Sequence, residues 1–235
     1  MESFQMDGLI GIGAYTPAEA GRLLRVHPSK ISRWLRGHSI QGKLYEPLWM
    51  PEINLDDERV YLGFRDLMEI RVADAFIRAG VSAIRIRATI MAAREIIGQD
   101  HPLSTDKFRT DGREIFLHTV ETDEYGQERE RLLNLFRQQY EFKGIIDPIL
   151  KTVDFSADGN PLVWWPGGRK LNVVVDPARS FGQPIDARSS VPTAVLAAAG
   201  MQEGITGAAL AFAVTEASIR RSIEFESLMK HRAAA

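Results

Sequence analysis

Apolar positions recur at helical spacing in two short runs between residues 14 and 37, with a turn between them. The first run, Ala20, Leu23 and Leu24, follows the sequence Thr-Pro-Ala-Glu at residues 16–19. Threonine can cap a helix, proline suits its first position, and a glutamate three residues after the cap completes a capping box. This segment therefore predicts a short helix that begins after residue 16.

A second start signal, His-Pro-Ser, occupies residues 27–29, and the helical pattern after it ends at Gly37. Its apolar stripe consists of Ile31, Trp34 and Leu35. Packing the two stripes together leaves one side of the second helix polar and basic. The outward residues are Ser29, Lys30, Ser32, Arg33 and Arg36.

A helix pair with a basic outer face is typical of a helix-turn-helix, which presents these side chains to a DNA major groove. An ordinary helical hairpin with a solvated basic face is the alternative. The charge distribution favours DNA, because the segment from residue 14 to 45 has six cations and one anion, a net charge of +5, whereas the whole chain has −2. Phosphate binding requires a local basic patch and not a basic chain.

The candidate DNA-binding residues divide into two groups. We expect Arg33 and Lys30 to contact base edges, assisted by Ser29 and Ser32. The other cations are expected to hold phosphates: Arg22, Arg25, Arg36 and Lys43.

Two longer helical patterns follow a proline-marked stretch at residues 44–58, which predicts an ordered connection or a short wing. Apolar spacing predicts one helix over residues 64–79, and a second helix begins after Ser82 and ends at Gly98. Its arginines could approach phosphates, although a solvated helical surface is their more common role. They are Arg85, Arg87 and Arg94.

Between residues 103 and 184 the pattern changes to short strands with turn signals. Asp111-Gly112 predicts a hairpin between strands at 107–109 and 114–120. A helix is predicted to interrupt this β region over residues 128–142. The further predicted strands are residues 150–155, 162–165 and 171–175, with a turn at 156–160.

Trp164 and Trp165 are adjacent, so in a strand their side chains face opposite sides. One is expected in the core and the other at an edge or interface, with a stacking platform for a ligand as the alternative. Asp176-Pro177, Gly182 and Pro184 then predict a rigid corner that is structural and not catalytic.

The end of the chain returns to helical patterns, at residues 192–199, 203–212 and 215–229. This module mimics a second helix-turn-helix, but its reading side offers only Arg220 and Arg221 as cations, so we expect an interaction module. The elements together predict an α+β fold. Residues 1–100 would form the DNA-binding domain, and residues 101–235 the β region with the C-terminal helical module.

The chain has no cysteine, which excludes disulfides and thiolate metal sites. Its five histidines have no second ligand at metal-like spacing, so no metal and no cofactor is expected. Residues that could serve together as nucleophile, general acid and base are not found, and we expect a binding protein and not an enzyme. The N-terminus has no pattern of a secretory signal, and no apolar run is long enough to span a bilayer. The expected location is the cytoplasm.

The motifs, taken in order, resemble two known families. YTPAEAGRLLRVHPSKISRWL and YLGFRDLMEIRVADAFIRAGVSAIRIRATI are similar to the MerR-type winged helix-turn-helix. The remainder resembles a bacterial antitoxin family whose C-terminal domain has long been an uncharacterised domain. The matching segments are HPLSTDKFRTDGREIFLH, VVVDPARSFGQPI, VPTAVLAAAGMQEG and AVTEASIRRSIEFE. Residues 176–193 are the most specific part.

This resemblance implies a VapB-like antitoxin of a toxin-antitoxin system. Such an antitoxin binds and inhibits a PIN-like ribonuclease toxin, and it represses transcription of the shared operon. We expect a homodimer, or a higher even oligomer, on a pseudo-palindromic stretch of double-stranded operator DNA. Ser189-Ser190 replace a turn that is common in relatives, which leaves the contact surface of the C-terminal module open. The alternatives are a ligand-responsive MerR-like regulator without a toxin, with the β region as sensor, and an enzyme built on that region.

Overall fold

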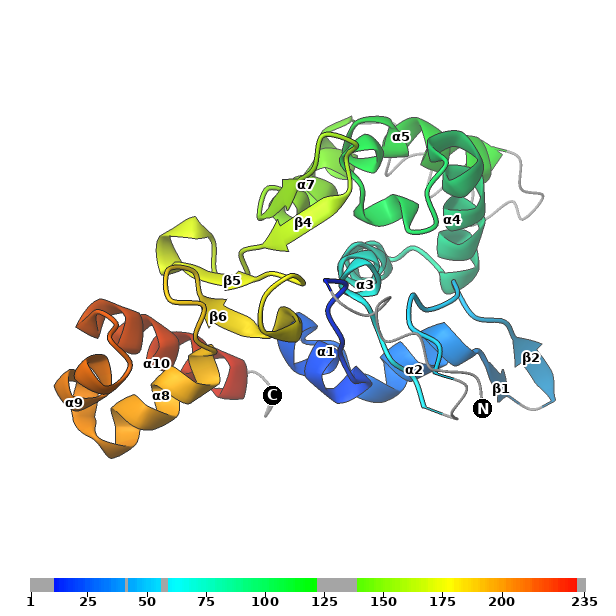
Figure 1. Ribbon diagram of the computed structural model, residues 1–235. Helices are drawn as coiled ribbons and strands as arrows, with labels where there is room; N and C mark the ends of the chain where they lie inside the picture. The colour runs from blue at the N-terminus through cyan, green and yellow to red at the C-terminus, as the bar shows by residue number, and fades with distance from the viewer. Residues whose placement is uncertain (1–10, 41, 56–58, 122–138, 232–235) are drawn as a thin grey trace, which may run out of the picture.

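The computed structural model describes residues 11–40, 42–55, 59–121 and 139–231. Helices and two small antiparallel sheets make up the fold, so the predicted α+β class is confirmed (Figure 1). The helices are α1 (Pro17–Leu24), α2 (Pro28–Arg36), α3 (Phe64–Arg78), α4 (Ala83–Ile97), α5 (Asp106–Glu121), α7 (Gln139–Leu150), α8 (Thr193–Gln202), α9 (Gly204–Ala211) and α10 (Glu216–His231). The strands are β1 (His38–Ile40), β2 (Lys43–Tyr45), β3 (Val153–Phe155), β4 (Pro161–Trp164), β5 (Val173–Val175) and β6 (Pro184–Asp186), with 3-10 turns η2 (Pro102–Ser104), η3 (Arg169–Leu171) and η4 (Ser180–Gly182).

The predicted N-terminal helix pair is confirmed, including its start signals. The Thr16 hydroxyl accepts a hydrogen bond from the Glu19 backbone N–H, and the Glu19 carboxylate accepts one from the Thr16 N–H at 2.8 Å. His27 caps α2 through its Nδ1, which accepts from the Ser29 N–H. The apolar stripe of α2 is buried against α1 and the core, which fixes the orientation of its polar side.

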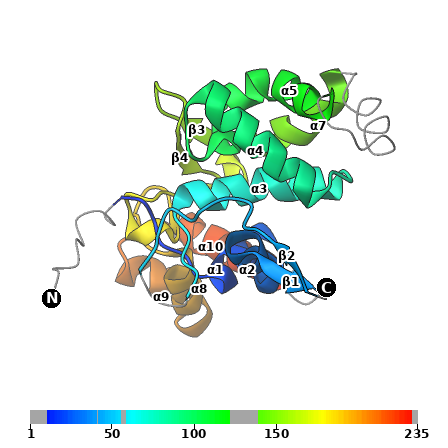
Figure 2. The same ribbon diagram turned by 90° about the vertical axis from the view of Figure 1, so that its right-hand side faces the viewer.

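Helix α3 lies between α1 and α2 on one side and α4, α5 and α7 on the other (Figures 1 and 2). Phe76 of α3 sits among three aromatic rings of α5 and α7. The ring centroids lie 5.6 to 6.3 Å away, on Phe108, Phe116 and Phe142. Aromatic pairs at this separation add to the stabilisation from burial, so α3 is the central helix around which the other elements assemble.

The hairpin predicted at Asp111-Gly112 is wrong, because helix α5 runs through both residues. Thr105 caps this helix, since its hydroxyl accepts from the Phe108 N–H at 3.2 Å. Gly112 packs beneath the Phe108 ring, where a Cβ atom would lie 2.9 Å from ring carbons. Close packing, and not a turn, therefore explains this glycine, and the first described strand of the β region is β3 at Val153. Most of the helix predicted over 128–142 falls outside the described residues.

The four-stranded antiparallel sheet has the order β3-β4-β5-β6 and connects α7 with the C-terminal helices. Trp164 is buried, and the guanidinium of Arg71 lies 4.3 Å from its ring centroid. Trp165 is half-buried, donates to Asp154 at 2.8 Å, and has the Arg169 guanidinium over its ring. The two indoles thus differ in burial as predicted, and an arginine of the chain covers each ring.

The three predicted C-terminal helices are confirmed as α8, α9 and α10. They enclose a small core of their own, formed by Leu196, Ala199, Ala208, Ala209 and Ile219. Phe225 and Met229 of α10, however, belong to the main core, which also takes residues from both sides of position 100. The domain boundary predicted there stays a prediction.

The predicted corner docks against the N-terminal segment. Gly182 has a φ of 78°, and its carbonyl accepts from the Tyr15 hydroxyl at 2.9 Å. A Cβ atom at Gly182 would lie 2.1 Å from that hydroxyl oxygen. Burial is the main cause that raises the pKa of Tyr15, with Asp176 and Glu19 nearby, so this hydroxyl remains a donor.

Gly182→Ala is therefore expected to lower the free energy of unfolding by about 2–4 kcal/mol, because left-handed strain and a steric clash add together. Chemical denaturation of the full chain measures the change. Gly98→Ala is the matched control, because Gly98 also has a positive φ, 75°, with a left-handed ψ of 30°, but open space at its Cβ position. We expect about 1 kcal/mol there from strain alone. Equal losses in both variants would contradict the proposed close contact.

Candidate nucleic-acid interface

Helix α2 presents Arg33 and Arg36 on its outer side, where both side chains are exposed. Within the described part of the chain, neither arginine has an ion-pair partner. Ser29 at the start of the helix is also exposed, and Ser32 donates its hydroxyl to the Pro28 carbonyl at 3.1 Å. The Ser29 hydroxyl in turn lies 2.8 Å from His27 Nδ1. This side of α2 thus carries two available cations and two locally hydrogen-bonded hydroxyls whose oxygens can still accept.

Two of the predicted DNA-binding cations are already paired. Lys30 Nζ lies 2.9 Å from Asp74 Oδ1, and its side chain is 32% exposed. It also lies 4.8 Å from the centroid of the Trp34 ring. Arg22 forms an ion pair with Glu226 at 3.0 Å. Both cations would have to share or leave these partners in order to contact DNA.

The remaining predicted residues lie at the edges of this surface. Arg25 is exposed at the turn between α1 and α2, and its carbonyl accepts from Arg78 at 3.2 Å. Lys43 belongs to strand β2, and its side chain is outside what the structure describes. The β1–β2 hairpin follows α2 directly and is braced by stacked rings of His38 and Tyr45, 5.0 Å apart.

Two hollows flank α2 and bring in arginines from other elements. One, of about 190 Å³, lies between α2, the hairpin and α4, and Arg87 lines it together with Arg33. The other, of about 400 Å³, is lined by Arg36 and Arg59. Sequence patterns gave Arg87 only a minor role and did not indicate Arg59, which no local pattern connects with α2. Arg85, in contrast, is buried and donates to the Thr119 carbonyl at 2.6 Å.

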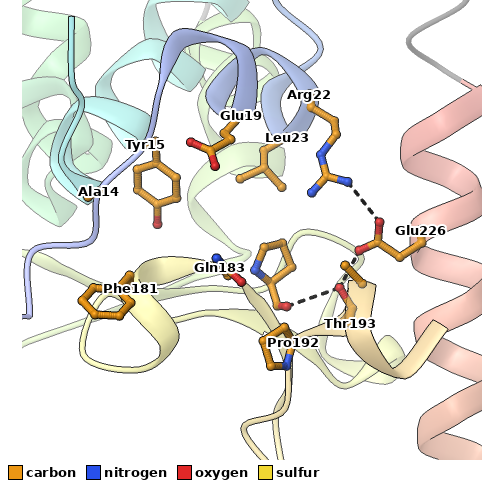
Figure 3. Close-up of a pocket in the computed structure, with 12 residues that line it drawn as sticks. Ala14, Tyr15, Glu19, Arg22, Leu23, Phe181, Gln183, Pro192, Thr193 and Glu226 are labelled. Atoms are coloured by element: carbon orange, nitrogen blue, oxygen red, sulfur yellow. Dashed lines mark hydrogen bonds and ion pairs between the residues drawn. The ribbon is translucent and has the colours of Figure 1, made fainter. Parts of the chain in front are cut away.

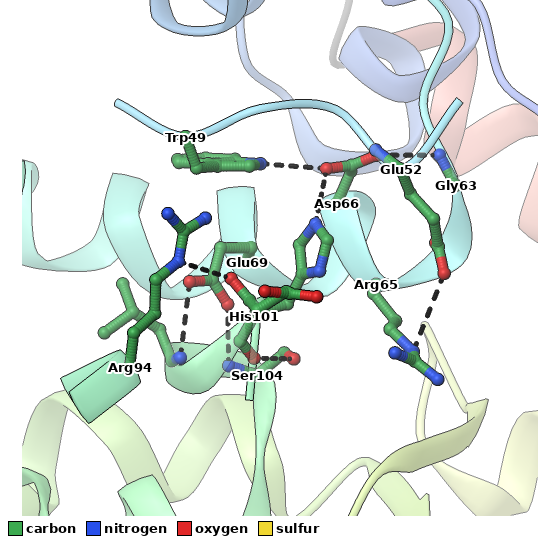
Figure 4. Close-up of polar contacts among 11 residues, drawn as sticks. Trp49, Glu52, Gly63, Arg65, Asp66, Glu69, Arg94, His101 and Ser104 are labelled. Carbon is green, nitrogen blue, oxygen red and sulfur yellow. Dashed lines mark hydrogen bonds and ion pairs between the residues drawn. The ribbon is translucent and has the colours of Figure 1, made fainter. Parts of the chain in front are cut away.

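A buried carboxylate, Asp66 of α3, holds the segment that follows the hairpin (Figure 4). Asp66 Oδ1 accepts from Trp49 Nε1 at 2.8 Å and lies 2.9 Å from His101 Nε2. Its Oδ2 accepts from the backbone N–H groups of Glu52 and Gly63, at 2.8 and 2.9 Å. Four groups from three separate segments therefore converge on one side chain, which the sequence patterns had not singled out.

A second buried carboxylate, Glu69, lies one helical turn further along α3. It accepts from the backbone N–H groups of Leu103 and Ser104, at 3.3 and 2.9 Å. Burial is the main cause that raises its pKa, to about 7, and nearby His101 opposes the increase. Burial also disfavours the charged imidazole of His101, but the hydrogen bond to Asp66 and the surrounding carboxylates outweigh it and raise the pKa of His101. Asp66, Glu69 and His101 together hold η2 and the segment that follows the hairpin against α3.

A pocket of about 230 Å³ separates α1 from the C-terminal helices (Figure 3). Glu226 of α10 crosses one end of it, where it accepts from Arg22 at 3.0 Å and from the Thr193 hydroxyl at 2.6 Å. Within the described residues, the Arg22–Glu226 ion pair therefore ties the candidate DNA-binding unit to the C-terminal helices, and the Tyr15–Gly182 and Ala14–Phe181 hydrogen bonds tie it to the corner before β6.

The C-terminal unit exposes apolar side chains and little charge. Glu203 is the single charged residue between Val191 and Thr215. Leu210 is 79% exposed and Met201 63% exposed. The two predicted cations of the reading side are both paired, because Arg220 contacts Glu216 at 3.2 Å and Arg221 lies 3.4 Å from Asp186.

Comparison with known proteins identifies the family. The chain is 31% identical over 193 residues to a Mycobacterium tuberculosis H37Rv protein named "Putative antitoxin VapB45", a match that covers 77% of this chain and 79% of the relative. The chain belongs to the VapB-type antitoxin family. The crystal structure of Rv2018 from Mycobacterium tuberculosis is 27% identical, with a TM-score of 0.70 over 89% of this chain and 96% of that one, so the two share a fold. No protein-family model matches the chain.

The resemblance to VapB antitoxins expected from the sequence is thus confirmed at the level of the family. None of the helices in the described ranges combines the length and apolar character that crossing a membrane requires.

Proposed function

We propose that this member of the antitoxin family is a DNA-binding antitoxin that neutralises a PIN-like ribonuclease toxin and represses transcription of its own operon in the cytoplasm. The observation that carries the proposal is the separation of two surfaces. One, around α2, is basic and polar; the other, on α8 and α9, is apolar and nearly uncharged. Phosphates require the first kind of surface, and a folded protein partner suits the second.

In this proposal α1 and α2 act as a winged helix-turn-helix of the MerR type, with the β1–β2 hairpin as the wing. Arg33 is the main base-reading residue, because its guanidinium has no intramolecular ion pair within the described residues. Lys30 is close enough to contact DNA, but it must first leave its ion pair with Asp74, so it contributes less to the affinity for DNA. Arg36 holds phosphates, with Arg59 adding positive charge beside it, and Arg87 adds positive charge beside Arg33.

The toxin binds the exposed side of α8 and α9. This surface supports the proposal because a charge-poor face with large exposed apolar side chains is unusual for a helical unit whose outer side contacts only water. The α10 helix is less suited to read DNA, since its arginines are paired and Glu226 holds it against α1. The protein acts by binding alone and has no catalytic role of its own.

Arg33→Ala is expected to weaken operator binding by about 1–3 kcal/mol and to relax specificity at one base pair. Arg36→Ala should instead weaken binding to all sequences alike and reduce the salt slope by about 1. Fluorescence anisotropy with DNA from directly upstream of the gene, and with an unrelated duplex, over a salt series separates these effects. Arg169→Ala, on η3 of the sheet region, is the control. If Arg33→Ala binds both duplexes as the unmodified chain does, α2 does not read the operator.

A further inference from the structure

Helix α4 carries an exposed stripe that nothing in the described chain covers. Ile84 is 64% exposed and Met91 is 59% exposed. With Ala88 between them and Glu95 after them, they follow the i, i+4, i+7, i+11 spacing of one helical face. The opposite face is buried against α5 and η2. Figure 2 views the molecule from the side on which α4 lies.

This stripe is complementary to itself when a second α4 packs against it in the antiparallel direction. With Met91 at the two-fold axis, positions equally distant from it face each other, so Arg87 meets Glu95 of the partner subunit, and the pair occurs twice. Ile84 then faces Gly98 of the partner subunit. Gly98 is exposed and has open space at its Cβ position, so it leaves room for a large side chain.

The two charges of this pair have no ion-pair partner of their own in the part of the chain that the structure describes. Glu95 is exposed and forms no ion pair within the described residues. Arg87 donates its Nε to the Pro47 carbonyl at 3.0 Å and one amino group to the Glu46 carbonyl, and among the described residues it has no carboxylate partner. Opposite charges at the flanks of an apolar seam set orientation and partner choice in paired helices.

We propose that the stripe of α4 is the contact through which two copies of this chain form a homodimer. Its consequence for the operator rests on the proposed function. Ile84 and Arg87 line the same hollow as Lys30 and Arg33, so each α2 lies beside the start of α4. The 15 residues of α4 span about 22 Å. The dimer therefore holds two α2 helices at opposite ends of a helix pair, a separation of the same order as the roughly 34 Å between operator half-sites.

One helix pair makes a small interface, below the roughly 1,200 Å² of stable complexes. The free protein should accordingly associate in the micromolar range, and binding to two half-sites should strengthen the dimer. Analytical ultracentrifugation of the full chain measures the association. Met91→Glu places two carboxylates against each other at the axis and is expected to raise the dimer dissociation constant at least tenfold. Ile96→Glu is the matched control, since Ile96 is 56% exposed on the same helix but lies off the stripe.

A charge exchange tests the flanking pair. Glu95→Arg should weaken the dimer by placing arginines opposite each other, and the double variant with Arg87→Glu should recover it. A chain that stays monomeric throughout the micromolar range, or a Met91→Glu variant that dimerises normally, would overturn the proposal. DNA binding separates this proposal from the proposed function: Met91→Glu should still bind a half-site duplex from upstream of the gene, whereas Arg33→Ala should weaken that binding and remain a dimer.

Discussion

Asp66→Ala is expected to lower the free energy of unfolding by about 3–5 kcal/mol, the range for removing one partner of a buried charged network. The change leaves Trp49 Nε1, His101 Nε2 and two backbone N–H groups in the interior without their acceptor. Each unpaired buried donor carries its own desolvation penalty. Urea unfolding followed by tryptophan fluorescence measures the loss.

Asp111→Ala is the control for this change, because Asp111 is an exposed aspartate of α5 and should alter stability little. Trp49→Phe serves if the alanine variant does not fold. It removes a single donor and keeps most of the ring volume, so a loss of about 1–2 kcal/mol is expected. If Asp66→Ala unfolds at the same urea concentration as the unmodified chain, the cluster does not stabilise the fold.

The sequence does contain a signal for the cluster around Asp66, although helical periodicity alone does not reveal it. Asp66 and Glu69 lie three residues apart within the apolar pattern of α3, on the side that the core requires. Buried carboxylates are rare unless they are paired or hydrogen-bonded. Two of them on one apolar face therefore indicate partners elsewhere in the chain. Which partners these are depends on the fold, since His101 lies 35 positions from Asp66.

Local rules predicted the elements that carry their own start and stop signals. The capping box at Thr16, the cap at Ser82 and the stop at Gly98 all appear where expected. The error at α5 came from weighing Asp-Gly as a turn above the helical spacing of Phe108, Ile115 and Phe116. Tertiary packing decides such conflicts. Here the core around Phe76 requires the rings of Phe108 and Phe116 on one face of the helix.

The sequence could not reveal which cations of the candidate site form ion pairs with carboxylates far away in the chain. The prediction placed Lys30 outward from helical geometry alone and assigned Arg22 to phosphate contacts. Their partners, Asp74 and Glu226, are 44 and 204 positions away. A helical wheel gives the side on which a cation lies but not the carboxylate that meets it. The proposed division between Arg33 as reader and Lys30 as a partly neutralised neighbour therefore depends on the structure.

The connection of α10 to the main core changes how the toxin surface must be tested. Removal of residues 186–235 is one way to take away the whole proposed toxin surface. However, Phe225 and Met229 are buried in the main core, and Asp186 ends strand β6. Such a truncation would expose core residues and affect both functions. Single substitutions of exposed residues avoid this problem.

Leu210→Glu is expected to weaken toxin capture by about 2 kcal/mol or more, roughly 30-fold, as for a large apolar side chain at the centre of a protein interface. Leu210 is 79% exposed, so the added carboxylate stays hydrated in the free antitoxin and the fold should be unchanged. In the complex it would be buried without a partner, which is where the loss arises. Co-purification and calorimetry with the proposed PIN-like toxin measure this change.

Leu162→Glu on β4 is the matched control, because Leu162 is also an exposed leucine but lies on the sheet. It should leave toxin capture intact, and Leu210→Glu should leave operator binding intact, since α9 lies in a unit with its own small core. Met201→Glu should repeat the loss if the surface extends across α8. A Leu210→Glu/Met201→Glu variant that still neutralises the nuclease would place the toxin on another face.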